Sequence, residues 1–196
     1  MKRAFKAIGH AVCLALALPA AALCGFGRSE PLFLMFAHFC AIIPGLPGDY
    51  LRIAFYRLTL RECSLLSRVS FGTFFAHTEC SIASGVYIGP YCVLGKVTIG
   101  QRTQIASGVQ VLSGRRQHAR TAEGQISSSV EGGFVVVKIG ADCWIGAAAI
   151  VMADVGAGST VGAGSVVVQP IPPHSVAVGN PARVIRTTAE VARTET

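Results

Sequence analysis

The feature that most constrains the fold is a six-residue repeat between residues 82 and 162 of the chain. An aliphatic residue followed by glycine or alanine returns nine times, at Ile82, Ile88, Leu94, Ile99, Ile105, Ile139, Ile145, Val155 and Val161. This period matches neither the ~3.6 residues of a helical turn nor the ~2 of a simple strand. The repeat therefore predicts short strands separated by turns. Each glycine would relieve a bend, and each aliphatic side chain would stack inward on its equivalent one coil away.

Composition narrows the class of protein further. The chain is 52% hydrophobic and 14% charged, which excludes a disordered chain, and its 22 glycines lack a Gly-X-Y period. The seven cysteines form no CxxC motif, which argues against a disulfide framework or a zinc ribbon and favours a reducing, cytoplasmic setting. Cys92 and Cys143 fall four positions after repeat residues and are predicted to be small core residues.

Positive charge is concentrated at the front of the chain. Residues 1–71 contain 8 Lys and Arg against 3 Asp and Glu, whereas residues 72–196 contain 9 against 7. A basic segment beside apolar sequence suits an anionic membrane surface. Aromatic residues are not interleaved with the basic ones as a base-stacking platform requires, so we expect no nucleic-acid partner.

Residues 1–68 read as an apolar and basic helical segment. The stretches 7–27 and 31–48 carry no formal charge, and each is near the ~20 residues that a helix needs to cross a bilayer. Basic residues flank the pair on both outer sides, which predicts a membrane hairpin or interfacial helices with both ends in the cytoplasm. Asp49 is predicted to cap a helix over 50–62. A cleaved signal peptide and a soluble helical cap over the repeat are the alternatives.

Three motifs near the end of the chain resemble a known family. They are IGADCWIG (139–146), VGAGSVV (161–167) and IPPHSVAVGNPARVIR (171–186). They are similar to the hexapeptide-repeat acyltransferases, and more narrowly to the maltose, galactoside, serine and exopolysaccharide O-acetyltransferases. The resemblance implies a left-handed parallel β-helix of about five coils over 69–186, followed by a tail over 187–196. It also implies a homotrimer with active sites between neighbouring subunits.

The repeat is interrupted between residues 113 and 137. A long irregular excursion from a rigid solenoid is usually functional or disordered. It contains His118, and an imidazole suits a general base because its ordinary pKa of ~6.5 lies near working pH. The resemblance implies that His118 is the base of acyl transfer. Its orienting group is left open among Glu79, Glu123, Glu131 and Asp142 and the backbone carbonyls.

The same resemblance implies acetyl-CoA as the acyl donor. Trp144 corresponds to a tryptophan beside the pantetheine arm, with Ala147 and Ala163 at wall positions, and Arg183 and Arg186 correspond to phosphate-binding arginines. Forked guanidinium donors suit phosphate oxygens. Relatives often carry lysine at the position of Gln169, which leaves the nucleotide contacts there open.

Together these observations predict a membrane-associated O-acetyltransferase on the cytoplasmic side of the inner membrane. Its acceptor would be a sugar hydroxyl, on an exopolysaccharide or a lipid-linked glycan precursor. The alternatives are a cytoplasmic enzyme for a soluble acceptor, such as serine or a free sugar, and a non-catalytic trimeric scaffold. No metal site is expected, because His77, His118 and His174 are too scattered for a zinc enzyme of the carbonic anhydrase type.

Overall fold

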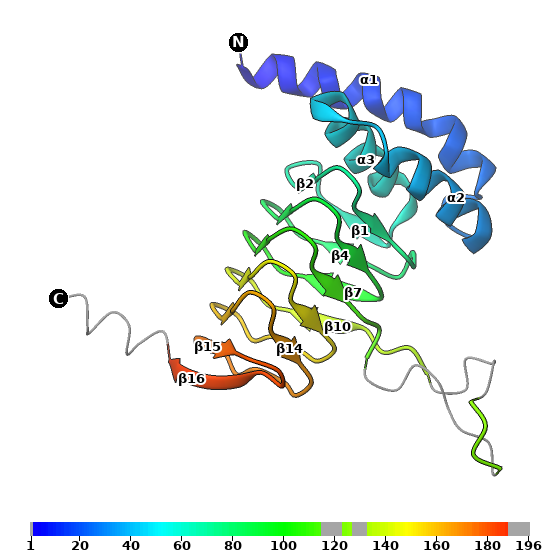
Figure 1. The fold of residues 1–196 in the computed structure, drawn as a ribbon. Helices are drawn as coiled ribbons and strands as arrows, with labels where there is room; N and C mark the ends of the chain where they lie inside the picture. The colour runs from blue at the N-terminus through cyan, green and yellow to red at the C-terminus, as the bar shows by residue number, and fades with distance from the viewer. Residues whose placement is uncertain (1, 115–122, 127–132, 188–196) are drawn as a thin grey trace.

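The structure is a computed structural model that describes residues 2–114, 123–126 and 133–187. Three helices come first, α1 (Lys2–Leu23), α2 (Glu30–Ala41) and α3 (Gly45–Thr59), and a stack of short strands follows. Figure 1 shows the helices gathered at one end of this stack and the C-terminal strand β16 at the other.

The strands form three parallel sheets, one on each side of a prism. Sheet A contains β1 (Glu62–Cys63), β4 (Ser81–Ile82), β7 (Val97–Ile99) and β10 (Val137–Ile139). Sheet B contains β2 (Arg68–Val69), β5 (Tyr87–Ile88), β8 (Gln104–Ile105), β11 (Trp144–Ile145), β13 (Thr160–Val161), β15 (Ser175–Val178) and β16 (Arg183–Thr187). Sheet C contains β3 (Phe74–Phe75), β6 (Val93–Leu94), β9 (Gln110–Val111), β12 (Ile150–Val151) and β14 (Val166–Val167).

Successive strands step from sheet to sheet, so each strand pairs with its equivalent in the next coil. Beyond β10, sheet A continues only as the bridges Ile139–Val155 and Val155–Ile171. All pairs are parallel except the last, in which β16 turns back against β15. Sheet C has one strand in each of five coils. The predicted parallel β-helix of about five coils is therefore confirmed.

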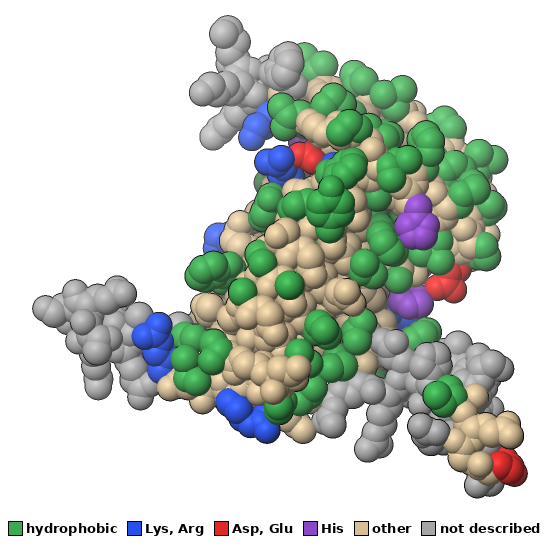
Figure 2. All heavy atoms as spheres, viewed as in Figure 1, with side chains coloured by type: hydrophobic (Ala, Val, Ile, Leu, Met, Phe, Trp, Pro, Cys, Tyr) green, Lys and Arg blue, Asp and Glu red, His purple; other side chains and the backbone are tan. Residues whose placement is uncertain are grey.

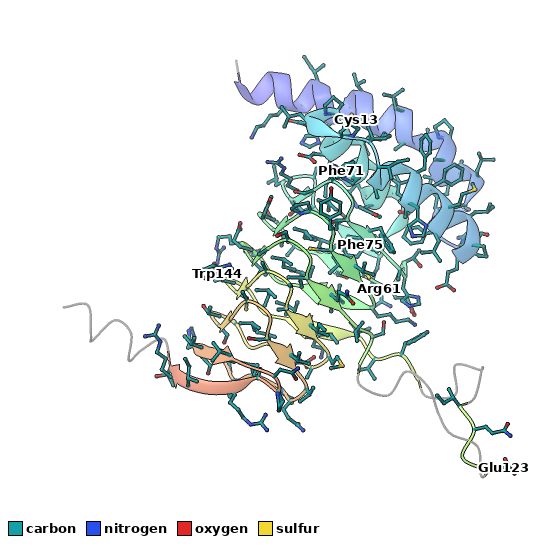
Figure 3. The ribbon with its side chains drawn as sticks, viewed as in Figure 1. Cys13, Arg61, Phe71, Phe75, Glu123 and Trp144 are labelled. Carbon is teal, nitrogen blue, oxygen red and sulfur yellow. The ribbon has the colours of Figure 1, made fainter. Side chains whose placement is uncertain are left out.

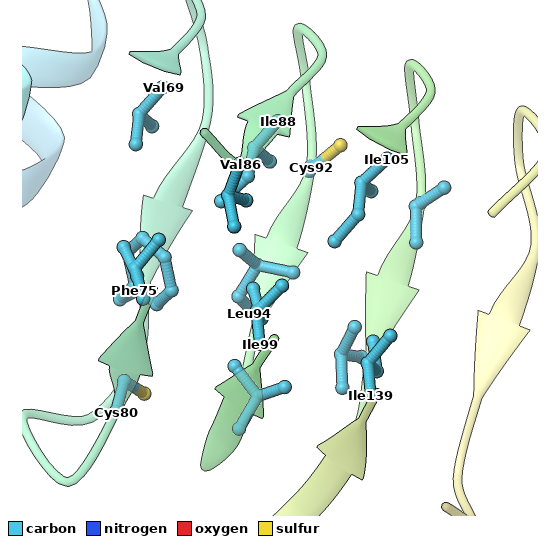
Figure 4. Close-up of a cluster of buried hydrophobic side chains, with 14 of the residues drawn as sticks. Val69, Phe75, Cys80, Val86, Ile88, Cys92, Leu94, Ile99, Ile105 and Ile139 are labelled. Atoms are coloured by element: carbon cyan, nitrogen blue, oxygen red, sulfur yellow. The ribbon is translucent and has the colours of Figure 1, made fainter. Parts of the chain in front are cut away.

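The interior is the column of repeat residues that the sequence predicts (Figure 4). All nine aliphatic repeat residues are 2% exposed or less, and Cys92 and Cys143 are buried beside them. The solenoid begins at Glu62, before the stretch 69–186 that the family resemblance covers. Cys63, Val69 and Phe75 fill the inward positions of this first coil. The six-residue pattern does not reveal this first coil, because cysteine and phenylalanine stand where the other coils have aliphatic residues.

The repeat glycines have a different role from the one expected. A Cβ atom added at Gly140 would lie 2.4 Å from the backbone nitrogen of Ala157, and one at Gly146 would lie 2.4 Å from that of Ala163. Glycine is thus required because neighbouring coils approach closely. The bends are made elsewhere, by residues of positive φ such as Arg102 (58°) and Asp142 (57°).

The helices α2 and α3 cap the first coil through a buried arginine. Arg52 is fully buried. Its guanidinium donates to the carbonyl oxygens of Val69 in β2 (2.9 Å) and of Cys40 (3.0 Å) and Ile43 (2.7 Å) at the end of α2. It also donates to Asp49 Oδ1 at 2.5 Å. The prediction that Asp49 caps a helix is wrong, because α3 begins at Gly45 and the Asp49 carboxylate is held by ion pairs within the helix and to the solenoid.

The two apolar stretches have different environments. In α2, Phe33 and Ala37 are fully buried, and Phe33 stacks on Phe55 of α3. At 12 residues, α2 is also shorter than the ~20 that a membrane span needs. In α1, the window Lys6–Leu23 is long and apolar enough to cross a membrane and is only 11% buried. The hypothesis of a helical cap over the solenoid therefore fits α2 and α3, whereas α1 has an exposed apolar face.

Candidate functional site

The excursion loop leaves the solenoid after β9 and returns at β10, between sheets C and A. Its base is fixed by Ser113, whose side-chain oxygen accepts from the Lys96 backbone N–H (2.8 Å) and whose carbonyl accepts from the Val135 N–H (3.0 Å). His118 lies outside the described residues, so its role as general base stays a prediction.

The described end of the loop packs on a polar cluster that joins it to the helices. The ring of Phe134 lies 4.9 Å from the ring of His77 and 5.7 Å from Lys96 Nζ. His77 Nδ1 is 2.8 Å from Glu30 Oε1 at the start of α2. Sequence reasoning missed this imidazole–carboxylate pair, because its two members are 47 residues apart and no motif links them.

Glu79 and Asp142, both considered as partners of His118, are each paired with a basic side chain. Glu79 forms an ion pair with Lys96, and the hydrogen bond from Lys96 lowers the pKa of the Glu79 carboxyl. Asp142 forms a two-point ion pair with Arg102 (2.6 and 2.7 Å), and this contact lowers its pKa. Glu123 is in the described part of the loop, and Glu131 lies outside the described residues.

The predicted cofactor residues gather mainly on the outer face of sheet B. Trp144 is directly opposite Thr160, Thr160 is opposite Val176, and Val176 is opposite Arg186. Residues in register point to the same face of a sheet, and neighbouring strands lie about 4.8 Å apart. The backbones of Trp144 and Arg186 are therefore about 14 Å apart along one line. The side chain of Trp144 is 60% exposed on this face, and Figure 3 shows it pointing away from the solenoid axis.

The remaining predicted residues lie around this line. Arg183 occupies the opposite end of β16, facing Val178, and is exposed. Ala147 and Ala163 are exposed at the corner between sheets B and C, where the N–H following Ala163 donates to the Ala147 carbonyl (2.8 Å). Gln169 is exposed at the corner between sheets C and A, so it does not join the line on sheet B.

No metal centre is evident in the part of the chain that the structure describes. Across residues 2–114, 123–126 and 133–187, no group of three or more His, Cys, Asp or Glu side chains is placed to hold an ion. The candidate site therefore consists of a line of residues on the outer face of sheet B, exposed arginines at the end of that line, and a loop whose sequence contains His118.

The chain matches a known protein over a short stretch of its sequence. No protein-family model matches the chain. SAR2635 of Staphylococcus aureus (strain MRSA252), an acetyltransferase by name, is 44% identical over 52 residues. The match covers 26% of this chain and 26% of SAR2635, so the chain aligns with about a quarter of the length of that relative.

Solved structures match over most of the chain. Galactoside acetyltransferase in complex with coenzyme A is 22% identical, with a TM-score of 0.61 over 86% of this chain and 85% of its own. The hexapeptide-repeat acetyltransferase VCA0836 from Vibrio cholerae is 20% identical, with a TM-score of 0.51 over 83% and 90%. The chain has the fold of the hexapeptide-repeat acyltransferases.

A third structure of this fold contains both a nucleotide sugar and coenzyme A. It is a variant of AntD, an N-acyltransferase from Bacillus cereus, in complex with dTDP-4-amino-4,6-dideoxyglucose and coenzyme A. It is 20% identical, with a TM-score of 0.52 over 66% of this chain and 75% of its own. The fold expected from the sequence motifs is therefore confirmed.

Proposed function

We propose that the protein transfers an acetyl group from acetyl-CoA to a hydroxyl of a sugar. The observation that carries this proposal is the line on sheet B, with Trp144 at one end and Arg186 at the other. An indole suits the pantetheine arm of the donor, and guanidinium groups suit its phosphates. The solved structures of galactoside acetyltransferase and AntD, which share this fold, contain coenzyme A.

In the proposed reaction, His118 acts as general base. Its imidazole accepts the proton of the acceptor hydroxyl while the hydroxyl oxygen forms a bond to the thioester carbonyl carbon. The carbon–sulfur bond then breaks, and the imidazolium returns the proton to the departing thiolate. The products are the acetylated sugar and coenzyme A, and the histidine regains its starting form.

An apolar surface on the helices supports a membrane-associated enzyme. Large side chains are exposed along α1 and continue onto α2, at Ile8, Val12, Leu16, Leu23, Met35 and Phe39. Figure 2 shows hydrophobic side chains covering this end of the molecule. A contiguous exposed apolar face marks an interaction site, and an amphipathic helix can lie in a membrane interface. We propose that α1 lies on the cytoplasmic face of the inner membrane, where a polysaccharide or lipid-linked glycan precursor would be the acceptor.

The outer face of sheet C supports the homotrimer. Phe74, Val93, Ile150 and Val166 form one row in register there, interrupted only by Gln110. The equivalent row on sheet A is polar, with Glu62, Ser81, Thr98 and Lys138. An apolar row of this kind suits burial against a neighbouring subunit.

The proposal is tested by acetyl-CoA turnover against a panel of sugar acceptors, scored by thiol release. The His118→Ala variant should lose about 100-fold or more in turnover, while its sedimentation remains that of the wild-type trimer. Near-normal acetylation by this variant would exclude His118 as the base. A chain that fails to bind acetyl-CoA in calorimetry would instead be a non-catalytic scaffold.

Fractionation tests the alternative of a soluble acceptor. Burial of α2 and α3 against the solenoid is the observation that favours it, because those helices have a structural role without any membrane. A protein that stays in the supernatant after membranes are pelleted, and that acetylates serine or a free sugar, would establish this alternative.

A further inference from the structure

A cavity lies beside the helical cap, away from the proposed donor site. It has a volume of about 280 Å³ and is lined by α1, by α3 and by the first coil of the solenoid. Leu46 and Leu66 stand on its wall and are 65% and 77% exposed, so its mouth is apolar. Lys6, His10 and Arg68 line the same cavity, so one apolar opening contains several basic groups.

The cavity carries an excess of positive charge. The Asp49 carboxylate is shared between two guanidinium groups, since Oδ1 accepts from the buried Arg52 (2.5 Å) and Oδ2 accepts from Arg68 (2.7 Å). Lys6 has no acidic partner within the described residues. The cavity lining thus holds two cationic side chains, Lys6 and Arg68, and one carboxylate that the buried Arg52 already neutralises. Arg68, whose side chain is 55% exposed, is available to a further anion.

The histidine of this cavity has an unsatisfied nitrogen. His10 packs on Tyr50 with ring centroids 4.8 Å apart, and its Nδ1 is buried without a hydrogen-bond partner in the described part of the chain. Buried polar atoms usually have a partner. Burial, followed by the charge of Lys6, lowers the pKa of His10, which favours the neutral ring.

The position of Arg68 connects the cavity with the proposed donor site. Arg68 is opposite Tyr87, Tyr87 is opposite Gln104, and Gln104 is opposite Trp144 on the outer face of sheet B. Three strand spacings separate Arg68 from Trp144, which is about 14 Å. A group held at Arg68 would thus lie on the same face as the donor, at the end nearest the helices.

We infer that this cavity binds the phosphate of a membrane lipid that carries or accompanies the acceptor. The basic side chains recognise the phosphate, and the apolar mouth continues the exposed face of α1 toward the acyl chains. The inference rests on the proposed membrane association and adds a headgroup class to it. A lipid-linked sugar seated here would extend from Arg68 along sheet B toward Trp144.

Flotation of the full-length protein with lipid vesicles tests the inference. Wild-type protein should bind phosphatidylcholine vesicles that contain phosphatidate more tightly than phosphatidylcholine alone. The Lys6→Gln/Arg68→Gln variant should lose about thirtyfold of this preference, at roughly 1 kcal/mol for each basic group near the surface, and still bind phosphatidylcholine like wild type. The charge-matched control, Arg57→Gln/Lys138→Gln, alters exposed residues outside the cavity and should keep the preference.

Two results would overturn the inference. The cavity variant could keep the wild-type preference for phosphatidate, or the control could lose as much, which would show a diffuse charge effect. If inorganic phosphate binds in calorimetry and abolishes the preference, the site takes free phosphate and not a lipid. Circular dichroism verifies that both variants fold. Acetyl-CoA turnover with a soluble sugar measures the proposed acyl transfer separately. A protein that lacks the phosphatidate preference but still acetylates the sugar would contradict the lipid site alone.

Discussion

Replacing Arg52 with leucine tests how the helical cap is held on the solenoid. The substitution removes every hydrogen bond from the guanidinium, which leaves the carbonyls of Val69, Cys40 and Ile43 without this donor and leaves Asp49 with Arg68 alone. Removing one partner of a buried ion pair costs about 3–5 kcal/mol. For a chain of this size, ~1 kcal/mol shifts the melting temperature by about 2–4 °C. The Arg52→Leu variant should therefore melt about 6–20 °C below wild type.

Two spectroscopic probes separate the cap from the solenoid in this experiment. Far-ultraviolet circular dichroism follows the helices, whereas fluorescence follows Trp144, the only tryptophan, in the fourth coil. Repeat structures lose stability locally, because each coil contacts only its neighbours. In the Arg52→Leu variant, the helical signal should be lost at a lower temperature than the Trp144 signal.

A second arginine of α3 provides the control. Arg57 is exposed, and Arg57→Leu should change the free energy of unfolding by no more than about 0.5 kcal/mol. The reasoning fails if Arg52→Leu melts with wild type, or if Arg57→Leu loses as much stability. It also fails if the two probes shift equally, since the cap and the solenoid would then unfold as one unit.

Three further predictions follow from the solenoid. Gly140→Ala should destabilise the protein by about 1–3 kcal/mol in urea unfolding, because its Cβ would lie 2.4 Å from the Ala157 nitrogen; an unchanged midpoint would contradict close coil packing. Thr103→Val should lower the free energy of unfolding by about 1–3 kcal/mol in the same assay, because the Thr103 hydroxyl donates to the Gly140 carbonyl at 2.7 Å. An unchanged midpoint would show that this hydrogen bond does not stabilise the fold. Burial raises the pKa of the Cys63 and Cys80 thiols to about 12, so the folded state favours the neutral thiol and stability should fall as pH rises from 9 toward 12. Thermal melts across that range check the sign, and rapid labelling of Cys63 or Cys80 in the native protein at pH 8, located by peptide mapping, would contradict the burial of these two residues.

The solenoid could be predicted from sequence because its interior obeys a strict local rule. Each inward side chain stacks on its equivalent, so the pattern repeats in sequence as it does in space. The first coil lacks the pattern, since Cys63 and Phe75 fill inward positions that are aliphatic elsewhere. The sequence predicts that the repeat glycines relieve bends, whereas the structure requires them for close packing of coils. The clash at Gly140 involves a residue of the next coil, so the local sequence does not indicate it.

The helical cap and the cluster at the base of the loop could not be predicted in the same way. Asp49 resembles a helix cap by its position, but its carboxylate pairs with Arg68, which is 19 residues away. The contact between His77 and Glu30 spans 47 residues. Such pairs depend on how the helices pack on the first coil, and no periodic signal in the sequence encodes that packing.

The reversal of the chain at β16 determines where the stack stops growing. A parallel β-helix exposes unpaired N–H and C=O groups at each end, which invites further copies to add end to end as in a fibril. At one end, Arg52 and the Gly72 N–H, which donates to the Ala41 carbonyl (2.8 Å), tie helices over the first coil. At the other end, β16 occupies the open edge of sheet B. The two ends of sheet B therefore carry unlike elements, helices at one and an antiparallel strand at the other, so neither presents the parallel edge of a coil to a second copy.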